Sequence, residues 1–414
     1  MKRGDNMLIQ FGTANYMSFK NETVLSACAS ADKSHQERLI KTGKDYILPS
    51  VVIYGANAAG KSNLFKAIKT AVSYVRDSDR ISNTAIPFLF DETSIDKESK
   101  FDFSFIYNNK EYDYGFSILK DRIIDEYLSV YNSQKPTLIF ERSNTVEYKF
   151  STANKKELSQ YIYKTDENRL FLSCSAFWNC KQTKDAYMWF KNGISIYDSQ
   201  NLDEAFVQEF VKDYSKEMKS FVLDFVNHAD LNIDDFMFRS KKLESISQRM
   251  DDYINRTSSE WNLDIIHKVK NGEEEKLISL PYSMESAGTR KVLSYGPIIR
   301  NVFKNGSVLI IDEIDSSLHP SLVRYLIDLF NDSSFNTNGA QLIFNTHDVS
   351  LLDQDIFRRD QVYFVEKDNR TGISDLYSLS EFSPRKSEDI RKGYLTGRYG
   401  AIPIVVSGGI GWED

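Results

Sequence analysis

Residues 55–62 read Gly-Ala-Asn-Ala-Ala-Gly-Lys-Ser and match the pattern G-x-x-x-x-G-K-[ST] of a loop that binds phosphate groups. The β-branched and aromatic run 51–54 predicts a buried strand before the loop, and apolar residues at helical spacing from Leu64 to Val75 predict a helix behind it. This order turns backbone N–H groups toward a phosphate, and the dipole of the helix favours its negative charge. A chance match in a glycine-rich turn would need neither strand nor helix. The stretch therefore predicts a nucleotide-binding site.

The end of this loop carries the side chains with specific tasks. Lys61 is expected to reach the β- and γ-phosphates, and the Ser62 hydroxyl is expected to ligate Mg²⁺. The residues predicted to contact ATP from this stretch are Gly55, Ala56, Asn57, Ala58, Ala59, Gly60, Lys61, Ser62 and Asn63.

Two carboxylates, Asp312 and Glu313, come directly after another predicted strand, Val308–Ile311. The carboxyl end of a strand is where an open α/β sheet places its ligands. We expect Asp312 to hold Mg²⁺, usually through water, and Glu313 to polarise the water that attacks the γ-phosphate. Adjacent carboxylates also occur by chance at strand ends, so the assignment of this pair to ATP hydrolysis depends on the motifs around it.

Three further motifs accompany the acidic pair in a fixed order. Upstream, Glu-Ser-Ala-Gly-Thr-Arg at 285–290 opens a predicted helix, and Ile-Asp-Ser-Ser-Leu-His at 314–319 follows the carboxylates. Downstream, the predicted strand Gln341–Phe344 leads into Asn-Thr-His-Asp, which places His347 just after a strand end. The sequence thus orders a phosphate loop, a Ser-x-Gly helix start, an acidic pair, an aspartate loop and a histidine.

This order resembles the ATP-binding-cassette ATPases, in particular the branch that holds the SMC, RecF and OLD proteins. Asp-Glu-Ile-Asp-x-x-Leu-His at 312–319 is typical of that branch, and Asn-Tyr-Met-Ser-Phe-Lys at 15–20 is similar to its N-terminal motif. The distinctive segment 392–403, together with Glu-Ser-Ala-Gly-Thr, resembles the RloA/AbiL-type AAA ATP-binding proteins of bacterial abortive infection.

The resemblance implies that two heads enclose two nucleotides. Ser286 and Gly288 would then bind the γ-phosphate of a partner subunit's ATP, His347 would contact the same phosphate from its own subunit, and Asp315 would couple the two sites. A helix-capping or core position is the alternative for His347. Ser286-Ala287-Gly288 departs from the fuller Leu-Ser-Gly-Gly-Gln of transporters.

Many cassette ATPases also use a glutamine as an additional Mg²⁺ ligand. Gln134 lies within a predicted meander, and the 87–90 segment is the other candidate for this position.

The expected fold is α/β, an ABC-ATPase head in which a P-loop core sheet stands beside an antiparallel β meander. Residues 1–154 are predicted to form the N-terminal part of the head, with the phosphate loop and the meander. Residues 155–256 are predicted to form a mainly helical insertion, and residues 257–414 the C-terminal part with the remaining motifs. The alternating aromatic residues between 101 and 116 are read as a packed sheet face.

The composition and charge of the chain restrict the partners and the cellular compartment that we expect for it. The net charge of −7 provides no general attraction to nucleic acid or anionic lipid. Three cysteines without metal-ligand spacing and no apolar stretch of membrane-spanning length predict a cytoplasmic protein without a membrane partner. One basic and aromatic group is read as a solvated helix face, with nucleic-acid contact as the alternative: Lys181, Lys184, Lys191, Trp178 and Trp189.

The leading functional hypothesis is an ATPase of anti-phage defence that dimerises, or assembles further, around Mg·ATP. It would gate a separate effector, a nuclease of the RloB or TOPRIM kind, since Glu366 only faintly resembles a TOPRIM glutamate and is read as structural. The alternative is a RecF- or SMC-like protein that binds DNA with ATP. The motor of a membrane transporter is a third interpretation, against which the missing full signature counts.

Overall fold

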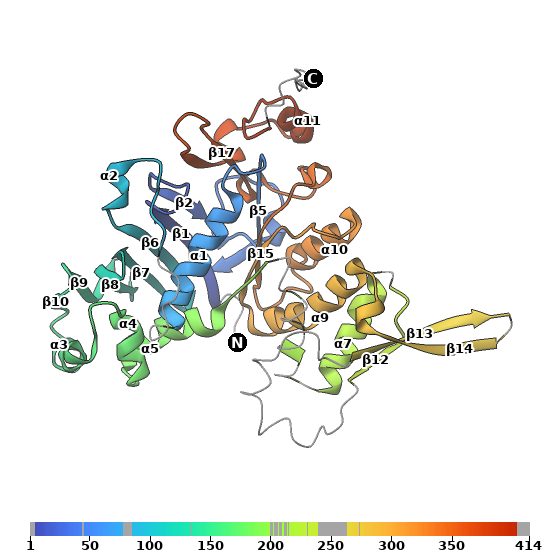
Figure 1. Cartoon of the computed structure of the whole chain (residues 1–414), viewed down its shortest axis with the longest axis horizontal. Helices are drawn as coiled ribbons and strands as arrows, with labels where there is room; N and C mark the ends of the chain where they lie inside the picture. Colours follow the sequence, from blue (N-terminus) through green and yellow to red (C-terminus); the bar gives the residue numbers. More distant parts are fainter. Residues whose placement is uncertain are drawn as a thin grey trace, which may run out of the picture.

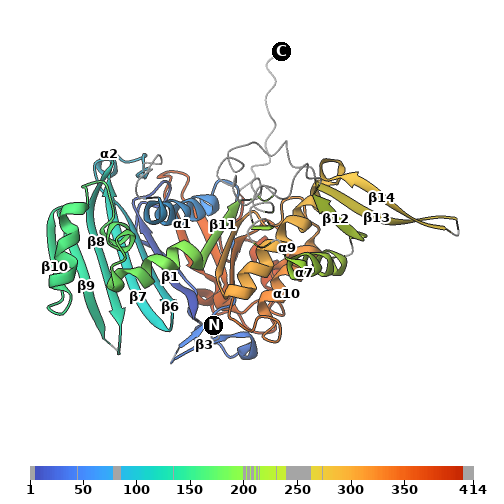
Figure 2. The same ribbon diagram turned by 90° about the horizontal axis from the view of Figure 1, so that it is seen from below.

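The computed structural model places two large sheets side by side, and a long hairpin projects from one end of the molecule (Figures 1 and 2). The residues described are 5–43, 45–77, 85–133, 135–198, 202, 206, 209–210, 213, 215–229, 231–238, 263–272 and 274–403. The predicted architecture, a mainly parallel core sheet beside an antiparallel meander, is confirmed.

The larger sheet has seven antiparallel strands in the order β10-β9-β8-β7-β6-β1-β2. Its strands are β1 (Asn6–Ala14), β2 (Thr23–Ser26), β6 (Ser99–Tyr107), β7 (Lys110–Leu119), β8 (Arg122–Tyr131), β9 (Pro136–Ser143) and β10 (Glu147–Phe150). Phe101, Phe103 and Phe105 of β6 are fully buried, as their alternation with polar residues predicts.

The core sheet has six strands in the order β11-β15-β16-β5-β17-β18, and all but β18 run parallel to one another. Its strands are β5 (Ser50–Gly55), β11 (Ile194–Asp198), β15 (Val308–Asp312), β16 (Gln341–Asn345), β17 (Val362–Lys367) and β18 (Ser374–Ser378). The parallel strands end at one common edge, where the phosphate loop also begins.

A third sheet carries the projecting hairpin, and a two-stranded ribbon lies near the N-terminus (Figure 2). The third sheet consists of β12 (Asp235–Phe238), β13 (Leu263–Asn271) and β14 (Glu274–Pro281), and the ribbon of β3 (Ile40–Thr42) and β4 (Asp45–Ile47). β13 and β14 form an antiparallel pair, in which Asp264 lies opposite Pro281 and Asn271 opposite Glu274.

The helices pack on both faces of the core sheet. The α-helices are α1 (Lys61–Arg76), α2 (Glu92–Ile95), α3 (Lys155–Leu158), α4 (Phe171–Phe177), α5 (Lys181–Met188), α7 (Lys216–His228), α9 (Ala287–Asn305), α10 (Pro320–Asn331) and α11 (Ile390–Leu395). Short 3-10 helices are η1 (Gln36–Arg38), η2 (Ser159–Lys164), η6 (Tyr282–Met284), η7 (Val349–Leu351), η8 (Arg359–Gln361) and η9 (Leu379–Phe382), and η3 (Trp189–Gly193) is a π-helix.

Side chains of β5 alternate between two hydrophobic cores. Val51 and Ile53 join α1 and the antiparallel sheet in one core, whereas Val52 and Tyr54 join α9 and α10 in the other. A strand buried on both faces reads as a continuous apolar run, which explains the signal before the phosphate loop. The core sheet is therefore held from both sides, and its strand ends form a rigid support for a site.

The range 155–256 is helical only in part. α3, α4 and α5 precede β11, which pairs in parallel with β15 inside the core sheet, and β12 pairs with the hairpin strand β13. The mixed burial of β11 fits an edge strand, whose pattern is weaker than that of a central strand. Residues 239–256 lie outside the described part, and the domain boundaries themselves stay a prediction.

The start of α4 is tied to the antiparallel sheet by a buried carboxylate. Glu126 of β8 accepts hydrogen bonds from the backbone N–H groups of Phe171 (2.6 Å) and Leu172 (2.9 Å) at the start of α4. The guanidinium group of the buried Arg142 lies 4.0 Å from the Glu126 carboxylate, so the negative charge of Glu126 is balanced. Burial raises the pKa of Glu126, while Arg142 and these hydrogen bonds oppose the rise.

The basic and aromatic group divides into two environments. Trp189 is fully buried and stacks on Phe105, with ring centroids 4.2 Å apart. Trp178 is half exposed, and the ammonium group of Lys164 lies 3.9 Å from the centroid of its ring. Trp189 is therefore a core residue and cannot serve as a stacking surface for bases.

Candidate nucleotide-binding site

The edge at which the parallel strands end brings the predicted motifs together. Ile311 of β15 pairs with Phe344 of β16, and Asn345 of β16 pairs with Ile53 of β5. The loops that leave these strands therefore start next to one another, with α1 rising from the phosphate loop (Figure 1). This arrangement is the one that open α/β sheets use for ligand binding.

Both glycines of the phosphate loop are required by close packing. A Cβ atom on Gly55 would lie 2.4 Å from the carbonyl oxygen of Val365 in β17. Gly60 has φ +121°, and a Cβ atom there would lie 2.6 Å from Ser374 Oγ and 2.9 Å from Ser18 Oγ. The loop is thus pressed between β17, the start of β18 and the turn after β1.

Polar contacts support the loop from the side away from its ligand face. Ser374 Oγ donates to the carbonyl oxygen of Ala59 (2.6 Å), and Asn63 Nδ2 donates to Ser18 Oγ (2.9 Å). Asn57 and Ala58 are exposed, and Ala58 has φ +60°. The structure therefore gives Asn63 a bracing contact, while the tip of the loop faces solvent.

Lys61 lies within the curve of the loop. Its Nζ donates to the carbonyl oxygens of Gly55 (2.8 Å) and Ala56 (3.1 Å). Burial lowers the pKa of Lys61, and the nearby carboxylates of Asp312 and Glu313 oppose this change. A partly desolvated ammonium group interacts more strongly with an incoming phosphate than one in water.

Ser62 and Asp312 provide the two protein oxygens of the predicted Mg²⁺ site. Ser62 Oγ donates to Asp312 Oδ1 at 3.2 Å, so the two groups already adjoin. In the described part of the chain, no group of three or more His, Cys, Asp or Glu side chains could hold a metal. The pair nevertheless fits Mg²⁺, which is commonly held by one or two protein groups together with water and phosphate oxygens.

Asn345 holds the carboxylate of Asp312 and the backbone of Glu313, a role that no sequence motif indicated. Its Nδ2 donates to Asp312 Oδ1 (2.5 Å), and its Oδ1 accepts from the backbone N–H of Glu313 (2.6 Å). Glu313 has φ +57°, a left-handed conformation that costs a residue with a side chain about 1–2 kcal/mol. The fully buried carboxamide compensates this turn and aims Asp312. Its position at a strand end, just before Thr-His, was the available signal.

The side chain of Asp315 contacts the backbone of His347. The N–H of His347 donates to Asp315 Oδ2 at 3.1 Å, whereas Asp315 Oδ1 is buried and has no hydrogen-bond partner within the described residues. Burial, followed by the charge of Lys61, lowers the pKa of His347, and Asp315 opposes the shift. His347 is therefore favoured as neutral imidazole beside the phosphate loop.

Ser286 and Gly288 stand at the start of α9. Ser286 is the N-cap, and its Oγ accepts from the N–H of Thr289 at 3.1 Å. A Cβ atom on Gly288 would lie 3.1 Å from the carbonyl oxygen of Ser317, and Lys291 Nζ donates to the carbonyl oxygen of Ser316. In the described chain the hydrogen bonds of Ser286 stay within its own helix, so the structure does not join it to the phosphate loop of the same subunit.

Glu285, just before that helix, is held by the projecting hairpin. His267 of β13 lies 2.7 Å from Glu285 Oε1 through Nε2 and 2.7 Å from the carbonyl oxygen of Asn232 through Nδ1. Because both oxygens only accept, the two bonds coexist only when both ring nitrogens carry a proton. Burial alone would lower the pKa of His267, but these bonds outweigh it and raise the pKa.

The two candidates for an additional Mg²⁺ ligand remain without support. Residue 134 lies outside the described part of the chain. The 87–90 segment packs beside the turn after β1, where the N–H of Phe88 donates to Asn15 Oδ1 at 3.2 Å, and it contains no glutamine.

The fold and the family match define an ABC-type P-loop ATPase head. Comparison with known proteins supplies the family. The family model described as "AAA domain, putative AbiEii toxin, Type IV TA system" matches residues 50–353, and the chain belongs to this family.

A curated relative is described as "Retron Vc95 probable ATPase" from Vibrio cholerae serotype O1 biovar El Tor. The alignment extends over 348 positions at 23% identity, and it covers 73% of this chain and 66% of that protein. The match thus spans just under two thirds of the relative's length.

Two solved structures illustrate the similarity to SMC heads. One is the "SMC head domain from Thermotoga maritima", with 13% identity, a TM-score of 0.41, and coverage of 91% of this chain and 99% of that chain. Another is the Smc head with an extended coiled coil bound to the C-terminal domain of ScpA from Pyrococcus furiosus, with 14% identity, a TM-score of 0.41, and coverage of 95% and 98%.

Among the described residues, no helix combines the length and the apolar composition that crossing a bilayer requires.

The bridging carboxamide generates a first prediction. Asn345→Ala should lower ATP hydrolysis by roughly 10–100-fold, because Asp312 and the Glu313 backbone lose their common support. Phosphate release is the measurement, with thermal unfolding to verify that the variant is folded. Asn338→Ala is the matched control, since its amide binds the carbonyl oxygen of Phe303 instead. A folded Asn345→Ala protein with the wild-type rate would disprove the positioning role.

The imidazolium of His267 generates a pH prediction. A raised pKa in the folded state means that this contribution to stability is complete below the unfolded pKa of about 6.5 and disappears as pH rises through the folded value. The destabilisation caused by His267→Gln should therefore be largest near about pH 6 and shrink above about pH 8. Urea midpoints across this range provide the measurement, and the exposed His228→Gln is the control. A difference that is independent of pH would contradict the charged form.

Proposed function

We propose that this chain hydrolyses ATP at the edge of its core sheet and that two copies close around two Mg·ATP molecules. The observation that carries the proposal is the connected set Ser62, Asp312, Asn345 and Glu313 beside Lys61. These groups come from three separate segments, and their side chains suit phosphate, Mg²⁺ and an attacking water.

Each group has a defined task in the proposed reaction. Backbone N–H groups of the phosphate loop and Lys61 hold the β- and γ-phosphates, and Ser62 and Asp312 hold Mg²⁺, which neutralises phosphate charge. Glu313 orients the attacking water and accepts its proton. His347, favoured as neutral imidazole, donates a hydrogen bond to the γ-phosphate.

The closed dimer is supported by the surroundings of Ser286 and Gly288. Their helix start lies against Ser316 and Ser317, which directly follow Asp315, and Ser286 has no hydrogen bond to its own phosphate loop in the described chain. A second copy would bring this helix N-terminus to the γ-phosphate, where its dipole favours negative charge. Asp315 then lies between the site of its own subunit and the helix offered to the other.

A role in anti-phage defence rests on the family and on the retron relative. We propose that ATP-dependent closure gates a separate effector, a nuclease of the RloB or TOPRIM kind. Glu366 takes part in this chain's own packing, since Tyr377 Oη donates to it at 3.2 Å. The catalytic carboxylates of the nuclease are therefore assigned to the partner.

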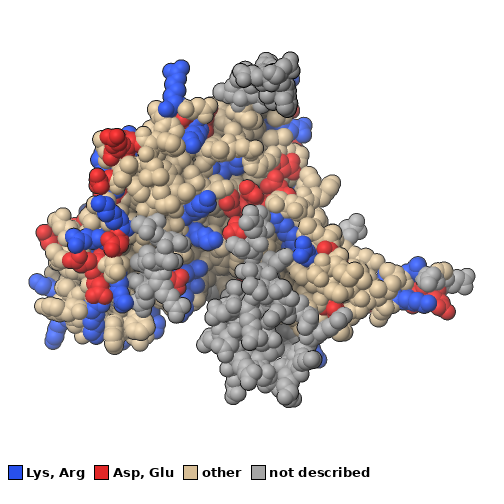
Figure 3. Space-filling model, viewed as in Figure 1, with Lys and Arg blue, Asp and Glu red and all other residues tan. Residues whose placement is uncertain are grey.

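DNA binding in the manner of RecF or SMC proteins is the alternative. On the face shown in Figure 3, Lys and Arg side chains are interspersed with Asp and Glu rather than gathered into one stripe. Together with the net charge of −7, this distribution favours the effector-gating hypothesis.

Replacing the proposed base should separate ATP binding from its hydrolysis. Glu313→Gln should reduce phosphate release by about 10²–10⁴-fold while ATP remains bound, because the amide cannot accept the proton. Light scattering with ATP should then show a persistent dimer. Glu147→Gln on the exposed strand β10 is the control. Hydrolysis by Glu313→Gln at the wild-type rate would exclude Glu313 as the base.

Mixing two inactive variants tests the shared site. Ser286→Arg and Lys61→Ala should each abolish hydrolysis, but their mixed dimer contains one complete site. Random pairing makes half of the dimers mixed, with one of two sites intact, so recovery of up to about a quarter of the wild-type rate is expected for an isologous pair.

The matched control combines both substitutions in one chain and mixes it with wild type. Those mixed dimers contain no complete site, so activity should come from wild-type homodimers alone. Failure of the two single variants to restore any activity would contradict the shared-site arrangement.

A further inference from the structure

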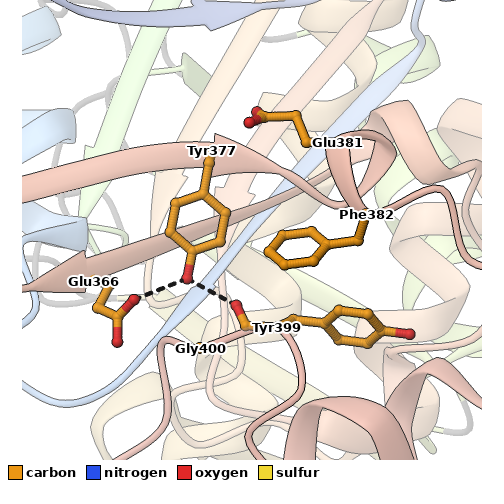
Figure 4. Close-up of a pocket in the computed structure, with 6 residues that line it drawn as sticks. All are labelled: Glu366, Tyr377, Glu381, Phe382, Tyr399 and Gly400. Carbon is orange, nitrogen blue, oxygen red and sulfur yellow. Dashed lines mark hydrogen bonds between the residues drawn. The ribbon is translucent and has the colours of Figure 1, made fainter.

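A pocket of about 510 Å³ lies where β17, β18, η9 and the segment after α11 meet (Figure 4). Its six lining residues are Glu366, Tyr377, Glu381, Phe382, Tyr399 and Gly400. Phe364 and Tyr399 belong to the core that contains α9 and α10, and residue 366 points to the same face of β17 as residue 364. The pocket therefore opens on the face of the core sheet opposite α1.

The walls combine aromatic rings with carboxylates. The rings of Tyr377 and Phe382 are 5.7 Å apart between centroids, and Phe382 meets Tyr399 edge to face at 5.3 Å. Glu366 and Glu381 are exposed, and none of the lining residues carries a positive charge. Aromatic faces and carboxylates together attract cations and repel anions.

One hydroxyl proton in the pocket serves two acceptors. Tyr377 Oη lies 2.8 Å from the carbonyl oxygen of Tyr399 and 3.2 Å from Glu366 Oε2 (Figure 4). A phenol has a single hydroxyl proton to donate, and the nearer acceptor, the carbonyl oxygen of Tyr399, forms the stronger hydrogen bond with it. Glu366 is therefore left with acceptor capacity for an incoming N–H group.

The remaining wall residues are held in place. The backbone N–H of Ser378 donates to Glu381 Oε1 at 2.8 Å, and Tyr399 Oη donates to Glu388 Oε1 at 2.7 Å. A Cβ atom on Gly400 would lie 2.6 Å from Tyr377 Oη and 2.7 Å from Glu366 Oε2. Glycine at this position thus keeps the space in front of Glu366 open.

The chain already binds a guanidinium group beside this pocket by the same chemistry. Arg398 has its guanidinium carbon 5.7 Å from the centroid of the Tyr399 ring and its Nη1 2.5 Å from Glu388. A planar guanidinium can stack on a ring and donate to a carboxylate at the same time, whereas an ammonium group is a point charge.

We infer that the pocket binds a guanidinium group, which stacks on the exposed ring of Phe382 and donates to Glu366, and that this group is an arginine side chain of a partner protein. Small-molecule sites enclose most of their ligand. Here both carboxylates are exposed and Phe382 is 39% exposed, which suits the end of a side chain whose remainder stays on another surface. The inference does not depend on the ATPase function.

The test titrates the full chain, without nucleotide, with N-acetylarginine amide and follows binding by saturation-transfer NMR. N-acetylcitrulline amide, of the same shape but uncharged, is the matched probe. The arginine probe should bind and the citrulline probe at least about tenfold more weakly, because a charge-assisted hydrogen bond is lost. Equal binding of the two probes, or no binding at millimolar concentration, would overturn the proposal.

Two variants locate the site. Glu366→Gln, which keeps the shape of the side chain, should weaken the arginine probe about tenfold, and Gly400→Ala should abolish binding by occupying the space before Glu366. Glu274→Gln on the distant hairpin is the control and should bind as wild type does. Thermal unfolding establishes that each variant is folded. Unchanged affinity in folded Glu366→Gln would overturn the site.

The source of the guanidinium is tested separately with capped Gly-Arg-Gly and free L-arginine. Tighter binding of the capped peptide supports a partner's side chain, because its backbone continues out of the pocket. Tighter binding of free L-arginine would overturn the assignment to a partner protein.

Discussion

The carboxamide of Asn345 is the contact on which the candidate site depends. Its N–H group holds the Asp312 carboxylate, and its oxygen holds the left-handed backbone of Glu313, so one fully buried side chain supports two residues with different proposed tasks. This is possible only because β15 and β16 are parallel neighbours that end at the same edge. The pairing of two strands thus brings the proposed Mg²⁺ ligand and the proposed base side by side.

The phosphate loop is constrained in a comparable way from its other side. β17 approaches so closely that a Cβ atom on residue 55 would have no room, and Ser18 and Ser374 fill the space over Gly60. The loop is therefore shaped by the turn after β1 and by the two strands after the last motif. Packing on both faces of β5 makes this support rigid, since neither core can shift without disturbing the other.

A second set of contacts joins the site to the helix that begins at Ser286. Lys291 and Gly288 lie against the backbone of Ser316 and Ser317, and Asp315 is the residue immediately before these two serines. His267 on the hairpin anchors Glu285, the residue before the helix cap. A movement of the hairpin would therefore displace the start of this helix and, through it, the loop that follows the acidic pair.

The sequence by itself determined the elements whose signals are local. The phosphate loop, the strand before it, the helix from Lys61 and the strand that ends in Asp312 follow from contiguous residues and their periodicity, and the structure has them where expected. Only the tertiary structure decided that β11 enters the core sheet, that Asn345 bridges the Asp312 carboxylate and the Glu313 backbone, that His267 holds Glu285 and that an aromatic pocket forms around Glu366. Each of these joins residues that are far apart in the chain, by contacts that periodicity and short motifs do not encode. The burial of β11 at a sheet edge is too partial to mark a strand, and a single asparagine or histidine carries no spacing of its own.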